Sequence, residues 1–177
     1  MRIILLDHSG SMGQPFSGKA AFAGRTRTTE ASVKLEAAKT ELLRSVASLA
    51  SATPIALFEF ISTASLIYEG MSNNQTAIQR ALNALDAWGE TCIEAALDKA
   101  SEYAAKLRNV PIIQVLVISD GLSTDRVSAE AAAQRFAQQG TVIINVILID
   151  PTEHGEQVAR AIAVNGEVYA VTSSDVG

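Results

Sequence analysis

The sequence predicts an α/β fold in which a doubly wound, mostly parallel sheet carries helices on both faces. Strand-like apolar runs alternate with segments whose apolar residues recur at helical spacing, which is typical of such a sheet. The run 141–149 is almost unbroken in apolar residues, as a central parallel strand buried on both faces should be. Only a few small polar residues separate the runs 56–61 and 65–69, too few for a helical crossover. These two runs therefore predict an antiparallel hairpin at one edge of the sheet.

The other elements follow in chain order. The first strand covers 3–6, and a helix with one apolar face follows over 33–50. Thr91 and Glu94 read as a capping box at the start of a helix. Gly140 is a usual stop for the alanine-rich helix that begins at Ser128. The remaining predicted segments are helices over 76–85, 93–107 and 153–163, a strand over 114–119, a turn at 165–166 and an edge strand over 168–171.

Length and composition limit the class of protein. The 177 residues fit one domain, 1–177, with 48% hydrophobic residues and a core that needs no disulfides. A net charge of -5 opposes general nucleic-acid binding. The chain has no apolar run of the roughly 18 residues that a membrane helix needs and no signal-peptide layout, so we expect a cytoplasmic protein without membrane contact. The single cysteine, Cys92, is expected to be a small packing residue.

Oxygen-bearing side chains gather where two predicted strands end. Asp7, Ser9 and Ser11 alternate on a turn just after the first strand, and Asp120 closes the strand over 114–119. Thr91 lies in a loop that could reach them. Ligands of open parallel sheets bind at the carboxyl ends of the strands, so these side chains should converge there. Carboxylate and hydroxyl oxygens suit Mg²⁺, with Mn²⁺ or Ca²⁺ as alternatives, whereas soft metals prefer His or Cys.

The pattern Asp-x-Ser-x-Ser with a distant Thr and a distant Asp-Gly resembles the metal-ion-dependent adhesion site (MIDAS) of von Willebrand factor type A domains. Gly10 and Met12 agree with the form common in bacterial members, and the resemblance covers nearly the whole chain. It implies a Rossmann-like fold and a Mg²⁺ site. The implied ligand residues are Asp7, Ser9, Ser11, Thr91 and Asp120. It also implies that the metal accepts an Asp or Glu carboxylate from a partner protein.

Each of these residues also has an ordinary structural explanation. Asp7, Ser9 and Ser11 could hydrogen-bond their own backbone in a turn, Thr91 could simply cap a helix, and Asp120 with Gly121 could form a turn. These separate explanations do not require that the residues occupy the right strand ends and loop in the right order. Their joint placement therefore favours a metal site.

Other residues near the motif receive no metal role. His8 is expected on the surface or in packing, and Trp88 in core or loop packing. The segment 13–32 is predicted to be an irregular insertion near the metal site. It carries Lys19, Arg25 and Arg27, either as part of a solvated loop or as a positive rim that selects acidic partners.

The sequence favours a metal-dependent protein-interaction module over an enzyme. The run 13–20 nearly spells a phosphate-binding loop, but Ala20 stands where a Ser or Thr would hold Mg²⁺. Asp7, His8 and Ser9 are adjacent and point in divergent directions, so they cannot form a hydrolytic relay. One alternative is a metal-assisted phosphoesterase that uses the same oxygens. Another, implied by bacterial relatives, is a non-catalytic subunit of an ATPase-linked chelatase or stress-response assembly.

Overall fold

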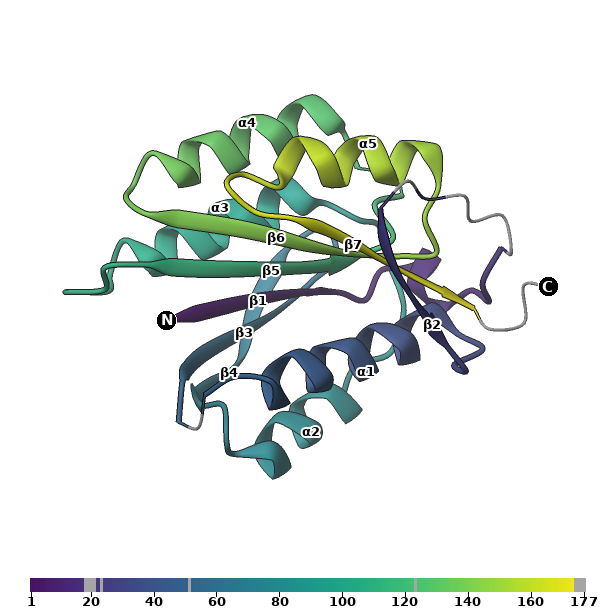
Figure 1. Cartoon of the computed structure of the whole chain (residues 1–177), viewed down its shortest axis with the longest axis horizontal. Coiled ribbons are helices and arrows are strands. Elements are labelled where there is room, and N and C mark those ends of the chain that lie inside the picture. The colour runs from purple at the N-terminus through teal and green to yellow at the C-terminus, as the bar shows by residue number, and fades with distance from the viewer. Residues whose placement is uncertain (18–21, 23, 51, 123, 174–177) are drawn as a thin grey trace.

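The computed structural model describes residues 1–17, 22, 24–50, 52–122 and 124–173. A seven-stranded sheet in the order β2-β7-β6-β5-β1-β3-β4 forms the centre of the molecule (Figure 1). All neighbouring strands are parallel except β3 and β4, which form the antiparallel hairpin at one edge. The strands are β1 (Arg2–Asp7), β2 (Arg25–Thr29), β3 (Pro54–Phe60), β4 (Ala64–Met71), β5 (Ile113–Ser119), β6 (Val142–Ile149) and β7 (Val168–Ser173).

Helices cover both faces of this sheet, so the predicted fold class is confirmed. Figure 1 shows α1 (Lys34–Ala47) and α2 (Gln75–Asn83) on one face, and α3 (Ile93–Ala104), α4 (Arg126–Ala137) and α5 (Glu153–Ile162) on the other. Side chains alternate between the two faces of a strand, so β1 contributes to both apolar cores. Ile3 and Leu5 pack on the side of α3, α4 and α5, and Ile4 and Leu6 pack on the side of α1 and α2. Within the described residues, no helix is long and apolar enough to cross a membrane.

The strand β2 corrects two predictions. It lies within 13–32, a segment expected to be irregular, and it pairs in parallel with β7, which is therefore not an edge strand. Its sequence alternates Arg and Thr, and four of its five residues are exposed. Because this edge strand has no apolar face, its sequence lacks the alternation of apolar and polar residues from which a strand is predicted. Residues 18–21 and 23 lie outside the described part, and Lys19 and the other two residues at the end of the phosphate-loop-like run lie among them.

The predicted capping box is also wrong. Cys92, not Thr91, is the N-cap residue of α3, and no side chain makes a capping hydrogen bond there. The amide of Cys92 donates to Ile61 O at 2.8 Å, which fixes the chain one residue beyond the expected cap. The hydroxyl of Thr91 therefore makes no capping hydrogen bond to α3.

Candidate metal site at the carboxyl edge of the sheet

Three buried carboxylates lie at the carboxyl ends of three neighbouring parallel strands. Asp7 is the last residue of β1, Asp120 follows β5, and Asp150 follows β6. Their exposed fractions are 0%, 0% and 1%. Asp7 and Asp120 were predicted from the sequence as site residues, whereas Asp150 was not, although it also follows an apolar strand directly.

Four of the five predicted ligand residues form one connected cluster. The amide of Ser9 donates to Asp7 Oδ1 at 2.8 Å, and the hydroxyls of Ser9 and Ser11 are 3.2 Å apart. The Ser11 hydroxyl in turn donates to Asp120 Oδ1 at 3.2 Å. Residues 109 positions apart in the sequence therefore meet at one point, as the sequence analysis expected.

The fifth residue, Thr91, lies in a loop that runs beside the serine turn. Gly10 N donates to Gly89 O at 2.9 Å, and Trp88 N donates to His8 O at 3.0 Å. Thr91 itself is buried. No hydrogen bond to its hydroxyl is found among the described residues, so this oxygen is available to a ligand.

Asp7 is held in place by short polar contacts but remains poorly solvated. The Ser119 hydroxyl donates to Asp7 Oδ2 at 2.5 Å, and Ser119 Oγ also accepts the amide of Gly121 at 2.9 Å. Burial raises the pKa of Asp7 to about 6, the hydrogen bonds from Ser119 and Ser9 oppose this shift, and the nearby charge of Asp120 adds to it. A bound cation would offset both the burial and the repulsion.

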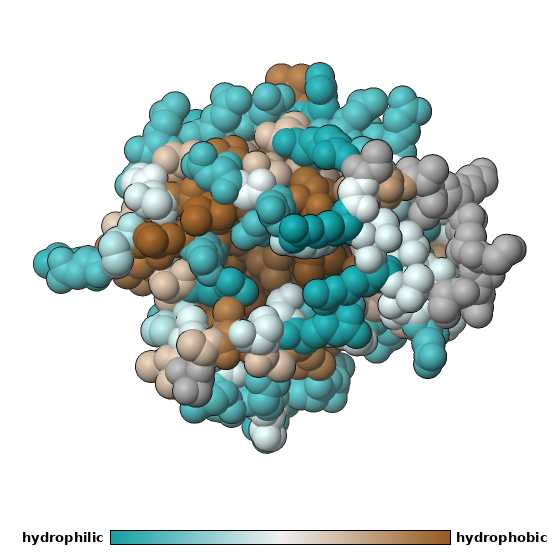
Figure 2. Space-filling view, in the orientation of Figure 1, coloured by the Kyte–Doolittle hydropathy of each residue, from teal (hydrophilic) through white to brown (hydrophobic). Residues whose placement is uncertain are grey.

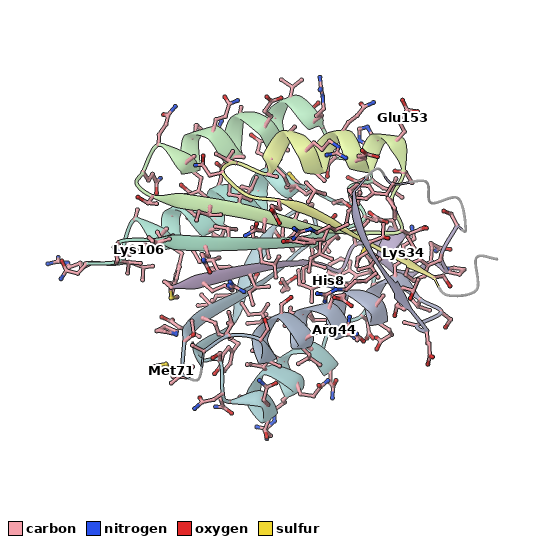
Figure 3. The ribbon with its side chains drawn as sticks, viewed as in Figure 1. His8, Lys34, Arg44, Met71, Lys106 and Glu153 are labelled. Carbon is pink, nitrogen blue, oxygen red and sulfur yellow. The ribbon has the colours of Figure 1, made fainter. Side chains whose placement is uncertain are left out.

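Lys34, the first residue of α1, contacts the site and was not predicted from the sequence. Its ammonium lies 3.2 Å from Asp120 Oδ2 and 3.3 Å from Asp150 Oδ2, and its side chain is only 5% exposed. Figure 3 labels Lys34 near the edge of the sheet where the parallel strands end. Asp150 also accepts the amide and hydroxyl of Ser17, at 2.9 Å and 3.0 Å. A lysine at the start of a helix usually reads as a solvated residue, so nothing in the sequence marked it.

The turn that carries Asp120 is fixed by close packing against the start of α5. Gly121 has a φ of +69°, a conformation that favours glycine. A Cβ at Gly155 would lie 2.4 Å from the carbonyl oxygen of Asp120, so only glycine fits there. The position of Asp120 therefore depends on α5 as well as on β5.

His8 packs as the sequence predicted, whereas Trp88 does not. His8 is buried, its Nδ1 lies 2.8 Å from Asp86 O, and its Nε2 contacts the Glu59 carboxylate, so it packs as expected. Trp88 was expected in core or loop packing, but it is 62% exposed. The backbone of its loop is anchored to the serine turn, whereas its ring is not buried.

Arg25 and Arg27, which the sequence placed either in a solvated loop or in a positive rim, lie in β2 and are each paired with an acidic side chain. Arg25 pairs with Glu167 and Arg27 pairs with the buried Glu41, each at 3.3 Å. Both line a cavity of about 610 Å³, which runs along the sheet from Arg2 at the start of β1 to Val171 in β7. Figure 2 shows this face hollowed, with apolar surface at the bottom between hydrophilic side chains.

The donor set fits a hard cation. Within the described part of the chain, no group of three or more His, Cys, Asp or Glu side chains is placed to hold a metal ion. A cation at this edge would therefore depend on hydroxyl oxygens as much as on the carboxylates of Asp7 and Asp120. Mixed hydroxyl and carboxylate oxygens are ligands that Mg²⁺ accepts.

A doubly wound sheet with an oxygen-lined carboxyl edge defines a class of α/β ligand-binding domains. The family model described as von Willebrand factor type A domain matches residues 3–123, and the chain belongs to this family. Domains of this family are generally interaction modules. Comparison with curated protein sequences gives no match.

Solved structures share the fold at low sequence identity. BatB from Bacteroides thetaiotaomicron is 19% identical with a TM-score of 0.70, over 98% of this chain and 91% of that one. A von Willebrand factor type A protein from Catenulispora acidiphila is also 19% identical with a TM-score of 0.70, over 98% of this chain but 38% of that one. The domain of the type V pili tip protein Mfa5 from Porphyromonas gingivalis is 13% identical with a TM-score of 0.74, over 96% of this chain and 88% of that one.

Proposed function

We propose that this chain is a metal-dependent protein-interaction module of the adhesion-site type. In this proposal, three hydroxyls and two carboxylates hold Mg²⁺, the carboxylates directly or through water, and Mn²⁺ and Ca²⁺ are accepted by the same donors. These ligand residues are Ser9, Ser11, Thr91, Asp7 and Asp120. An Asp or Glu carboxylate of a partner protein completes the coordination.

The observation that carries this proposal is the connected cluster from Asp7 through Ser9 and Ser11 to Asp120. Independent turn functions would not require these side chains to meet. The two hydroxyl contacts of Ser11 are 3.2 Å long, which exceeds the usual length of an O–H···O hydrogen bond. Such contacts are weak, so a cation can replace them at little cost.

When bound, the ion supplies an electrophilic centre for an outside carboxylate. The protein supplies the orientation of its ligands. Ser119 and the Ser9 amide fix the two oxygens of Asp7, and the Leu122 amide holds Asp120 Oδ1 at 3.0 Å. Because these contacts already exist, the ligand side chains need little rearrangement when the ion binds.

The function that we propose is the binding of a partner and not catalysis. The two histidines of the chain, the usual general bases, are both engaged elsewhere. His8 contacts Glu59 and Asp86 O, and His154 Nε2 lies 3.0 Å from Thr124 O. Neither contact places an imidazole on the oxygen cluster.

A metal titration tests the proposal directly. Trp88 is the single tryptophan, and its loop is hydrogen-bonded to the serine turn, so its emission should report ordering at the site. We expect Mg²⁺ to change the Trp88 emission of the wild type in a saturable way, and Asp7→Ala to abolish the change. Asp98→Ala is the matched control, because Asp98 pairs with Arg135 on the helical surface, and it should titrate like the wild type.

A pull-down from native lysate tests the partner. Proteins retained by the wild type should be lost both with chelator and with Asp7→Ala, and kept by Asp98→Ala. An identical set of proteins in every lane, together with no saturable metal response, would defeat the proposal.

The cytoplasmic location expected from the sequence stays a prediction, which fractionation of the native source would test.

A further inference from the structure

A buried ammonium group touches the candidate metal site. Lys34 is 4% exposed, and its backbone amide donates to Gln14 O at 3.2 Å, so the residue is fixed at the start of α1. A buried lysine is costly unless its charge is paired. The paired charges here are Asp120 and Asp150, which come from the ends of two adjacent strands.

The two oxygens of Asp120 are divided between different partners. Oδ2 lies 3.2 Å from the ammonium of Lys34. Oδ1 lies 3.2 Å from the hydroxyl of Ser11 and 3.0 Å from the amide of Leu122. Lys34 therefore takes one oxygen and holds the carboxyl group so that the other faces the serine cluster.

Of the four buried charged groups here, only Asp7 and Asp120 make contacts within the serine cluster. Asp7 and Asp120 together match the charge of Mg²⁺, but Lys34 places a positive charge against Asp120. Asp150 offsets that charge only in part at the cluster, because its contacts among the described residues are with Lys34 and Ser17 and not with the serines or Asp7. Charges in a buried setting interact more strongly than in water, so Lys34 would act on a bound cation more strongly than a solvated lysine would.

We propose that Lys34 is an internal cation that weakens metal binding in the absence of ligand and makes metal and acidic ligand bind cooperatively. An outside carboxylate replaces the negative charge that Lys34 cancels. The coupling is reciprocal, so the metal raises carboxylate affinity by the same factor as the carboxylate raises metal affinity. Lys34 is a positioning residue in this account, and the inference rests on the proposed function.

The opposite signs expected at Lys34 and Asp150 separate this account from a purely structural role. Removing the lysine charge should tighten metal binding, whereas removing the Asp150 charge should weaken it, because Lys34 would then act on the metal without its second acid. A lysine that served only to hold the fold would make both changes weaken binding. Lys34→Arg keeps the positive charge and should behave like the wild type.

The experiment is a calorimetric titration of the purified chain with Mn²⁺, with and without acetate as the carboxylate probe. Acetate should tighten Mn²⁺ binding to the wild type. Lys34→Met should bind Mn²⁺ alone about tenfold tighter or more, and acetate should add much less to it. Asp150→Asn should bind Mn²⁺ more weakly than the wild type, and far-ultraviolet circular dichroism checks that each variant is folded.

Each possible outcome of these titrations either supports or overturns the inference. Equal or weaker Mn²⁺ binding by folded Lys34→Met, or an acetate effect that the substitution leaves unchanged, overturns the inference while leaving the proposed function intact if Asp7→Ala abolishes binding. Should Lys34→Met not fold, Asp150→Asn still tests the inference, since unchanged or tighter Mn²⁺ binding by that variant overturns it. Binding by Lys34→Met but not by the wild type supports it. Absence of Mn²⁺ binding in every variant overturns both proposals.

Discussion

Replacing Asp7 by Asn should stabilise the metal-free protein, although Asp7 is a proposed metal ligand. Burial raises the pKa of this carboxyl from 3.8 to about 6, so keeping it ionised in the folded state costs free energy. A shift of roughly two units corresponds to about 3 kcal/mol when the group is fully ionised. An Asn keeps the oxygen that accepts the Ser9 amide, and its NH₂ group can donate to Ser119 Oγ, so little of this gain is lost.

The pH dependence follows from the same shift. The folded state binds more protons than the unfolded state between about pH 4 and pH 6, so the stability of the wild type falls as the pH rises through this window. Below about pH 4 Asp7 is protonated in both states and its cost disappears. The advantage of Asp7→Asn should therefore be about 2 to 3 kcal/mol at about pH 7.5 and close to zero at about pH 4.

Urea unfolding in chelator, followed by circular dichroism at these two pH values, measures the difference. Adding Mg²⁺ should reverse the order, because the ion stabilises the wild type and has lost a ligand in the variant. A variant less stable than the wild type in chelator at about pH 7.5 would refute the reasoning that Asp7 is an under-compensated buried charge.

Three further substitutions test the geometry around the site. Thr91→Val should leave metal-free stability within about 0.5 kcal/mol, because the hydroxyl caps no helix, while weakening Mg²⁺ binding in a calorimetric titration; a large loss of stability in urea would show that the hydroxyl is structural. Gly155→Ala should destabilise the fold by about 1 to 3 kcal/mol in thermal unfolding, because its Cβ would meet Asp120 O at 2.4 Å; unchanged stability and metal affinity would contradict that packing. Ser119→Ala should cost about 1 to 2 kcal/mol and weaken metal binding, since its hydroxyl serves both Asp7 and Gly121; metal affinity equal to that of the wild type would argue against its role in orienting Asp7.

The fold was predictable where one face of an element is buried. The apolar runs of β1, β5 and β6 and the short link of the β3–β4 hairpin carry that information in the sequence itself. The strand β2 was not predictable, because its Arg and Thr residues are exposed and it forms only by pairing with β7. Its position depends on a partner strand more than 130 residues away.

The site was predictable as far as its motif extends. Asp7, Ser9 and Ser11 share one turn, and Asp120 directly follows β5, the neighbouring strand of β1, so strand ends alone bring them together. Thr91 was misread as a cap, because its spacing to Glu94 fits a capping box although the helix begins one residue too late.

The charged partners beyond the motif were not predictable. Lys34 reads as an ordinary first-turn residue of a helix, and its burial against Asp120 and Asp150 depends on how α1 packs on the sheet. Asp150 was recognisable by its place after β6, but its contact with Lys34 was not, because that contact joins residues 116 positions apart.

The central claim is that oxygens from three separate segments surround one divalent ion. Crystals of the protein soaked in Mn²⁺, with diffraction measured at the manganese absorption edge, would locate that ion without reference to any partner. The account predicts an anomalous peak among the side chains of Ser9, Ser11, Thr91 and Asp120, absent from crystals of Asp7→Ala. No peak at this edge of the sheet under saturating Mn²⁺, or the same peak in Asp7→Ala, would contradict it.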